Sequence, residues 1–196
     1  FSAKSVGREE AWSTNFDLFV VPIDGSAPPK KITSNLAWDA QPKFSPDGKT
    51  LAYLTMSRAG FEADRYDIVL RDWTKGSERK VTLRADDSPA GDRSPADLAW
   101  SADGKELYCT ADHLGNHPLF AVDVATGSSR IVVPDGNAVS PASAPGGRLL
   151  YAMHSFMGPA ELYTVGRDGK GVQRVTRLND AKVEAARWGR PEQFSF

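Results

Sequence analysis

One short turn occurs three times in this chain, and it restricts the possible folds more than any other feature of the sequence. The stretch "FSPDGKTLAY" (Phe44 to Tyr53) returns as "WSADGKELYC" (Trp100 to Cys109) and, less closely, as "SAPGGRLLYA" (Ser143 to Ala152). An Asp-Gly pair between alternating apolar residues is a strong β-hairpin signal, because glycine adopts the positive φ that the turn needs and aspartate tolerates it. We therefore predict hairpin turns at three places: Asp47-Gly48, Asp103-Gly104 and Gly146-Gly147.

The same series of apolar segments follows each turn. The first segments are "TLAYLT", "ELYCTA" and "RLLYAM", the second are "YDIVLRD", "PLFAVDV" and "AELYTVG", and the third are "RKVTL", "SRIVV" and "QRVTR". With the strand before each turn, they make units of four short strands. An earlier, incomplete unit is visible in "FDLFVVPI" and "KKITS". Repeats of this length and content are typical of β-propeller blades.

These repeats predict an all-β fold, an open arc of a larger β-propeller with three complete blades of four antiparallel strands and one partial blade. The predicted boundaries are a partial blade at 1–34, complete blades at 35–96, 97–139 and 140–187, and the start of a linker strand at 188–196. Almost no segment has the pattern of a helix. Because the chain begins at Phe1, without an initiator methionine or a signal peptide, we expect it to be a fragment.

Composition and charge argue against some classes of binding partner, among them nucleic acids and membranes. The formal net charge is −1 and no block of like charges occurs, so the electrostatic footprint of a nucleic-acid-binding protein is missing. No apolar run reaches the length of about 18 residues that a membrane-spanning helix needs, which favours a soluble globular domain. The single cysteine, Cys109, can form no internal disulfide, and we expect it to be an unreactive core residue. The cellular compartment is not indicated.

No catalytic or metal-binding constellation stands out. The sequence has no G-x-S-x-G nucleophile motif; the nearest match, at 127–131, lacks the second glycine. His113 and His117 are four residues apart, but a glycine and a proline beside them disfavour the helix that would align them, so we expect solvated loop residues. The acidic stretch from Asp86 to Arg93 lacks the ligand spacing of a calcium loop and favours a solvated loop. We therefore predict no catalytic residue, no metal site and no cofactor.

Two long stretches resemble a known family. "NLAWDAQPKFSPDGKTLAYLTMSRAGFEADRYDIVLRDW" (Asn35 to Trp73) and "DLAWSADGKELYCTADHLGNHPLFAVDVATG" (Asp97 to Gly127) resemble the propeller of prolyl-oligopeptidase-family (S9) serine peptidases. The "GFEADR" segment narrows the resemblance to the branch of dipeptidyl-peptidase 5 and acylaminoacyl-peptidase. The ending "RWGRPEQFSF" is similar to the strand that leads from the propeller into an α/β-hydrolase domain. That domain, with its Ser, Asp and His, is missing from this sequence.

The resemblance implies a function. In this family the propeller sits over the active site of the hydrolase, restricts entry to short peptides and contacts the substrate N-terminus. The implied partners are a short peptide substrate and the α/β-hydrolase domain of the same parent chain. An open arc also leaves apolar sheet faces unburied, so a homo-oligomer is a further expectation. One alternative is a TolB-like propeller that acts as a protein-interaction module; another, disfavoured by the few histidines, is a propeller enzyme with its chemistry in the central channel.

The second unit carries extra residues that point to a binding surface. They fall in two connections, around 56–66 and around 84–95, which leave an antiparallel blade at the same end. Loops on a rigid scaffold often carry binding groups. The candidate substrate-binding residues are Phe61, Glu62, Asp64 and Arg65.

Each candidate has an expected role. A carboxylate such as Glu62 can hold a peptide α-ammonium group, Arg65 can clamp a carboxylate or orient Glu62, and Phe61 can wall a side-chain pocket. The alternative is that Glu62 and Arg65, three residues apart, form an ordinary surface ion pair worth at most ~1 kcal/mol.

Overall fold

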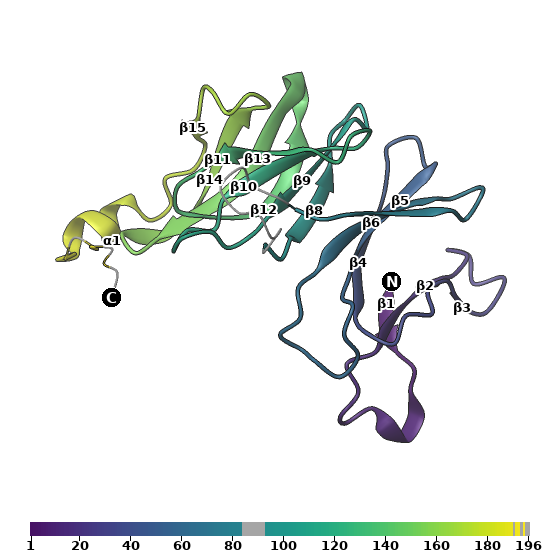
Figure 1. Ribbon diagram of the computed structural model, residues 1–196. Coiled ribbons are helices and arrows are strands. Elements are labelled where there is room, and N and C mark those ends of the chain that lie inside the picture. Colours follow the sequence, from purple (N-terminus) through teal and green to yellow (C-terminus); the bar gives the residue numbers. More distant parts are fainter. Residues whose placement is uncertain (84–92, 190, 193, 195–196) are drawn as a thin grey trace. The chain divides into compact units, whose positions relative to one another are not determined.

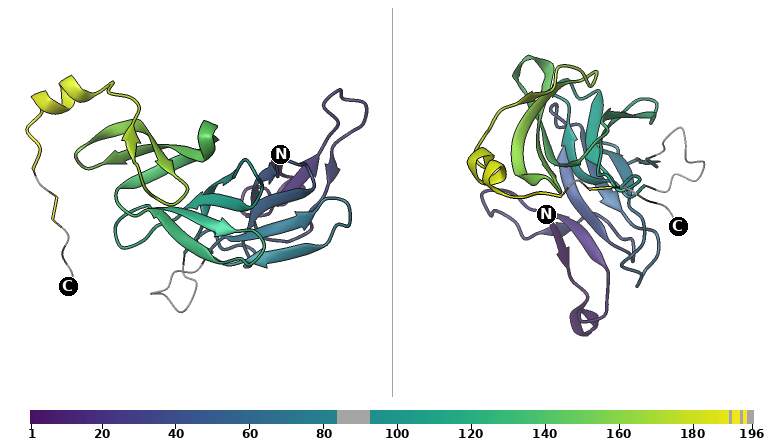
Figure 2. Two further views of the ribbon diagram at one scale, coloured as in Figure 1. Left: turned by 90° about the horizontal axis from the view of Figure 1, so that it is seen from above. Right: turned by 90° about the vertical axis from the view of Figure 1, so that its left-hand side faces the viewer.

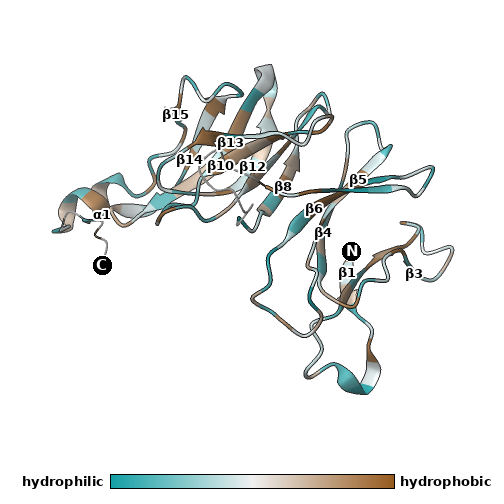
Figure 3. Cartoon of the chain, in the orientation of Figure 1, coloured by the Kyte–Doolittle hydropathy of each residue, from teal (hydrophilic) through white to brown (hydrophobic). Residues whose placement is uncertain are grey.

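The computed structural model describes residues 1–83, 93–189, 191–192 and 194 (Figure 1). The chain divides into two compact units, 1–96 and 97–196. Each unit consists of antiparallel sheets whose strands follow one another in chain order, as the turned views also show (Figure 2). Hydrophobic residues concentrate in the strands, and hydrophilic residues in the turns and loops (Figure 3).

The first unit contains a three-stranded and a four-stranded sheet. The three-stranded sheet is formed by β1 (Ser2–Lys4), β2 (Phe16–Val20) and β3 (Lys30–Lys31), with a short 3-10 helix, η1 (Gly7–Glu9), between β1 and β2. The four-stranded sheet is formed by β4 (Asp39–Phe44), β5 (Thr50–Thr55), β6 (Asp67–Asp72) and β7 (Glu78–Val81). Leu18, Leu51, Tyr53 and Val69 form a buried cluster between the two sheets.

The second unit contains two four-stranded sheets. One is formed by β8 (Ala96–Trp100), β9 (Glu106–Thr110), β10 (Leu119–Asp123) and β11 (Ser129–Val133). The other is formed by β12 (Asn137–Ala144), β13 (Arg148–Ser155), β14 (Gly158–Gly166) and β15 (Gln173–Arg174), with the 3-10 turn η2 (Pro145–Gly147) before β13. A core cluster that includes Tyr108, Leu119 and Leu149 joins these sheets.

The predicted fold class is confirmed, because the chain is all-β and builds three four-stranded antiparallel sheets and one three-stranded sheet in meander order. Two details differ from the expectation. The last strand, β15, has only two residues, and an unpredicted helix, α1 (Asp180–Ala185), follows it. Among the described residues, no helix combines the length and the apolar character that crossing a bilayer requires.

The three predicted turns form, but aspartate acts in them differently from the expectation. Gly48 and Gly104 have φ of 70° and 68°, whereas Asp47 and Asp103 are not among the described residues with positive φ. Instead, Asp47 Oδ1 accepts hydrogen bonds from Ser45 Oγ at 2.6 Å and from the Lys49 amide at 3.1 Å. Asp103 repeats both contacts with the equivalent residues. The expected positive φ of the aspartates is therefore wrong, and their carboxylates stabilise the turn as acceptors.

The first strands of two complete blades, β4 and β12, contain a bulge, and the first strand of the third, β8, has the same backbone conformation at the equivalent residue. Gln41, Asp97 and Ser140 all have a φ of 52° to 53°, and they are spaced along the chain in the same way as the three turns. The strand register shifts next to two of them, between Ala40 and Lys43 and between Val139 and Ala142. Such a shift is typical of an extra residue that is left out of the ladder.

An acid and a base pair across the third and fourth strands of three blades. The pairs are Asp17 with Lys31 at 2.5 Å, Asp67 with Lys80 at 3.5 Å, and Glu161 with Arg174 at 3.3 Å. All three acids are buried. The bases hold equivalent register positions, and in the blade of β8 to β11 this position is taken by Ile131. In the first unit, Asp17 and Asp67 lie at the starts of β2 and β6, where the connections 5–15 and 56–66 end.

Candidate functional site

All four predicted site residues lie in the loop that joins β5 to β6, residues 56–66. The loop starts next to Thr55 and ends at the buried Asp67, so both ends are anchored in the sheet. Lys80 of β7 lies 3.5 Å from Asp67 and also donates to Ser57 Oγ at 3.3 Å. The base of the loop is therefore fixed by a cation from the neighbouring strand.

Asp64 closes this loop on itself. One carboxylate oxygen accepts hydrogen bonds from the amides of Ser57 at 2.9 Å and Arg58 at 2.7 Å, and the other accepts from Arg58 Nε at 2.9 Å. Burial of the carboxylate opposes ionisation, but the two amides and the guanidinium outweigh it and lower the pKa of Asp64 to about 2. Both oxygens are thus engaged within the loop.

The Arg58 guanidinium also covers the ring of Phe61. Its central carbon lies 4.0 Å from the ring centroid, a cation–π contact. The ring is still 44% exposed, so part of it faces solvent. Arg58 is thus held on one side by Asp64 and on the other by Phe61.

Glu62 occupies the corner of a tight turn at the tip of the loop. The Asp64 amide donates to the Phe61 carbonyl at 3.1 Å, which closes the turn around Glu62. Glu62 is exposed and makes no hydrogen bond or ion pair with any residue that the structure describes. Arg65 lies 3.5 Å from Asp67 instead. The expected orientation of Glu62 by Arg65 is therefore wrong, and so is the alternative of a Glu62–Arg65 surface pair.

A second loop, which sequence reasoning missed, is joined to the first. The Gly60 amide donates to Thr14 Oγ1 at 2.9 Å, so the connection from β1 to β2, residues 5–15, contacts loop 56–66. We call these two segments the loop pair. The loop pair and the connection into β4 expose large apolar side chains, with Trp12 73% and Leu36 72% exposed. The exposed carboxylates of Glu9 and Glu10 lie in the same β1–β2 loop.

Aromatic stacking supports the base of the loop pair. The rings of Phe16, in β2, and Trp38, before β4, stack with centroids 4.5 Å apart, and Lys4 Nζ lies 5.1 Å from the Phe16 centroid. The second predicted loop, 84–95, lies largely outside the described residues, as does most of the acidic stretch from Asp86 to Arg93. Among the described residues, the candidate site therefore consists of the loop pair.

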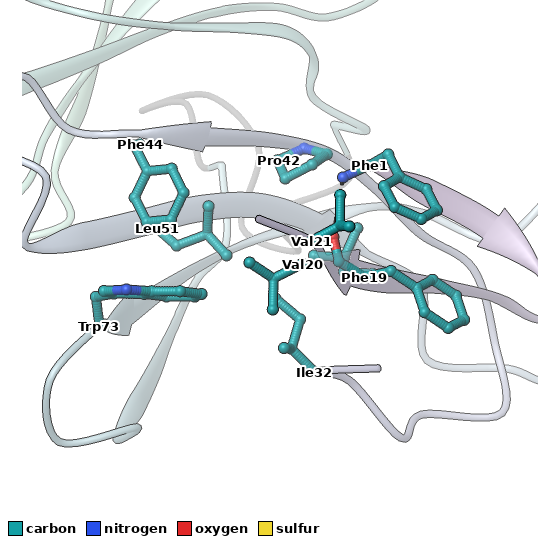
Figure 4. Close-up of a pocket in the computed structure, with 10 residues that line it drawn as sticks. Phe1, Phe19, Val20, Val21, Ile32, Pro42, Phe44, Leu51 and Trp73 are labelled. Atoms are coloured by element: carbon teal, nitrogen blue, oxygen red, sulfur yellow. Dashed lines mark hydrogen bonds between the residues drawn. The ribbon is translucent and has the colours of Figure 1, made fainter. Parts of the chain in front are cut away.

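An apolar pocket of the first unit lies at the other end of β5. It has a volume of about 270 Å³. Phe44, Leu51 and Trp73 point toward one another there, and the rings of Phe1 and Phe19 stack beside them (Figure 4). The side chains that line this pocket are all apolar. Its position, remote from loop 56–66, separates it from the candidate site.

Two of the histidines make local contacts. His117 Nδ1 lies 2.7 Å from Asp112 Oδ1, and His113 pairs with Asn116 in a tight turn. Among the described residues, no group of three or more His, Cys, Asp or Glu side chains could hold a metal ion.

Curated relatives are similar to most of the chain. Dipeptidyl-peptidase 5 of Porphyromonas gingivalis is 28% identical over 183 residues, which cover 93% of this chain and 26% of the relative. Dipeptidyl-peptidase 5 of Trichophyton equinum is 33% identical over 152 residues, which cover 71% of this chain and 20% of the relative. The predicted resemblance is confirmed, and this chain spans about a quarter or less of the length of the relatives it matches.

Solved structures share the fold at low identity. TolB from Acinetobacter baumannii has a TM-score of 0.65 and 22% identity, covering 86% of this chain and 39% of its own. Puromycin hydrolase has a TM-score of 0.64 and 18% identity, covering 90% of this chain and 31% of its own. The model of the TolB beta propeller domain matches residues 8–192. On the strand order of its sheets and on this match, the chain belongs to the TolB beta-propeller domain family.

Proposed function

We propose that this chain is the substrate-gating propeller of a serine exopeptidase that releases dipeptides or acylated residues from short peptides, and that Glu62 binds the free α-amine of the substrate. The observation that carries the proposal is an exposed carboxylate without a partner among the described residues, at the tip of a fastened loop. The similarity to dipeptidyl-peptidase 5 over 93% of the chain supports the peptidase context. The partners are then the short peptide and an α/β-hydrolase domain of the same parent.

An exopeptidase that removes dipeptides has to measure distance from a free amine. That amine is cationic below its pKa of ~7.7 to 8.0, so a fixed anion is the group that recognises it. Asp64 cannot serve, because both its oxygens are engaged by Ser57 and Arg58. Glu62 is the acid of this loop that stays available.

The test compares two substrate classes in the full-length protein that carries this chain. Glu62→Gln keeps the size of the side chain and removes its charge. Losing one partner of a charged hydrogen bond in a partly desolvated cleft costs ~2 to 5 kcal/mol. At ~1.4 kcal/mol per decade, kcat/KM for free-amine dipeptidyl substrates should fall about tenfold or more. N-acylated substrates carry no such charge and should lose far less.

Two control variants separate a specific anchor from a general effect. Glu9→Gln removes an exposed carboxylate from the other member of the loop pair. If it lowers the ratio of the two substrate classes as much as Glu62→Gln does, the amine responds to the summed negative charge rather than to Glu62. Arg65→Ala, which loses its contact with Asp67, should affect both substrate classes alike. An unchanged ratio in Glu62→Gln contradicts the proposal.

A second candidate function is a protein-interaction module without catalysis. The match to the TolB beta propeller domain and the similarity to TolB from Acinetobacter baumannii favour it. A serine-directed fluorophosphonate distinguishes the two. Labelling of the full-length protein supports the peptidase, and its absence supports the interaction module. This chain alone, which has no G-x-S-x-G motif, should take no label.

Self-association of the isolated chain stays a prediction. Leu162, Val172 and Val175 of the last blade are all at least 39% exposed. Exposed apolar side chains on a terminal repeat favour cover by another sheet. Sedimentation velocity over a range of concentrations tests this, and a single monomeric species throughout would contradict it.

A further inference from the structure

We infer that Asp64 keeps Arg58 away from Glu62, and that the free carboxylate of Glu62 depends on this competition between two acids for one cation. The inference rests on the proposed function of Glu62 as the amine anchor. It adds a positioning residue, Asp64, and a reason why a loop with two acids and two arginines leaves one acid unpaired.

The geometry gives Arg58 a complete set of partners without Glu62. Arg58 Nε donates to Asp64 at 2.9 Å, the Arg58 amide donates to the same carboxylate at 2.7 Å, and the guanidinium lies on the Phe61 ring. Asp64 is the better competitor because its side chain is only 10% exposed. Water therefore screens its attraction for the cation less than it screens that of the exposed Glu62.

Arg58 is also the cation of this loop that is positioned to respond. It sits against Phe61, the residue next to Glu62 in the chain. A long arginine side chain that loses its anion can reorient toward another one nearby. The other charged groups around the loop are held elsewhere, since Arg65 and Lys80 both lie 3.5 Å from Asp67.

The inference predicts that a substitution at Asp64 changes substrate binding by Glu62, although Asp64 itself does not contact the substrate. In Asp64→Asn the side chain keeps its shape and loses its charge, so Arg58 is released and pairs with Glu62. A surface ion pair of this kind is weak, so the preference for free-amine over N-acylated substrates should fall roughly two- to fivefold. Adding Arg58→Gln to Asp64→Asn removes the competing cation and should restore most of the preference.

The rescue separates this role from a merely structural one. If Asp64 only maintained the shape of the loop, the double variant Asp64→Asn with Arg58→Gln would be as impaired as Asp64→Asn alone, or more. That outcome overturns the inference. So does an unchanged preference in Asp64→Asn when Glu62→Gln changes it. Arg58→Gln alone, which leaves Glu62 without a competing cation, should keep the preference.

A second measurement needs no substrate. A carbon-13 carboxyl titration of Glu62, assigned through Glu62→Gln, should show a lower midpoint in Asp64→Asn than in the wild type, because a cation now stabilises the carboxylate. The double variant should return the midpoint toward the wild-type value. If Glu62→Gln leaves the substrate preference unchanged while these titration shifts occur, the proposed function is wrong and the competition for Arg58 stands. Equal midpoints in all three proteins overturn the competition itself.

Discussion

Thr14 Oγ1 accepts a hydrogen bond from the amide of Gly60 at 2.9 Å, and this contact joins loops that belong to two different blades. Thr14 is buried, while Gly60 is exposed and has a φ of 75°. The hydroxyl therefore fastens the outer part of loop 56–66 at a point between Arg58 and Phe61. Both members of the loop pair should lose order together when the contact is removed.

Thr14→Val tests this contact with an isosteric side chain that has no acceptor. We expect faster hydrogen exchange at the Gly60 amide and a loss of about 0.5 to 1.5 kcal/mol in the free energy of unfolding, the usual net value of one hydrogen bond. Thr14→Ser, which keeps the hydroxyl, is the matched control. Equal exchange at Gly60 in both variants would contradict the assignment.

Asp64 makes a pH-dependent contribution to stability. Its folded pKa of about 2 lies below the value of ~3.9 for an unfolded chain. The ionised carboxylate therefore stabilises the folded state fully above pH ~4, and this stabilisation is lost as the pH falls from about 4 to about 2. The difference in thermal midpoint between wild type and Asp64→Asn should shrink across this window. A difference that stays constant from pH 6 to pH 2 would refute the prediction.

Cys109 reports on the unfolding of the second unit. Its side chain is completely buried in β9, and burial raises the pKa of the thiol to about 12. Because the thiolate is the reactive form, an aromatic disulfide reagent at pH 8 should modify almost none of the native protein. One thiol per chain should react in denaturant. Rapid, complete reaction in native buffer would show that β9 is open to solvent.

Leu149 should be far more important for stability than Leu162, although both lie in the last blade. Leu149 is completely buried in the core cluster, and Leu162 is 39% exposed. Leu149→Ala should lower the free energy of unfolding by about 2 to 5 kcal/mol. Leu162→Ala should change it by about 0.5 kcal/mol. Denaturant titrations measure both values. If the two variants lost a similar free energy of unfolding, Leu149 would not be the core residue that the structure shows.

The strand repeat was predictable because its signals are local. The Asp-Gly turns and the alternating segments after them are readable within about ten residues, and the sheets follow this order. The position of loop 56–66 was predictable for the same reason, as a difference in length between repeats. Helix α1 was not, because its six residues carry no clear period.

The internal contacts of the site were less accessible to sequence reasoning. Thr14 and Gly60 are far apart in the chain, and nothing in either segment specifies the other as its partner. Which partners Asp64 and Arg65 bind depends on where β5 ends and β6 begins. Spacing alone favoured an ion pair between Glu62 and Arg65, which are three residues apart. That spacing brings side chains together on a helix, whereas these two residues lie in a loop.

The bulges at Gln41 and Ser140 have a consequence for changes in chain length. Side chains alternate between the two faces of a strand, and each extra residue reverses that alternation along the rest of the strand. Deleting one residue elsewhere in such a strand would turn core-facing side chains toward solvent, because every later pair would slip by one position. Deleting the extra residue itself would keep the flanking pairs, such as Ala40 with Leu54 and Lys43 with Ala52, and would remove only the bulge. In these strands a change in the number of residues is therefore tolerable at the bulge, whereas the paired positions permit substitution only.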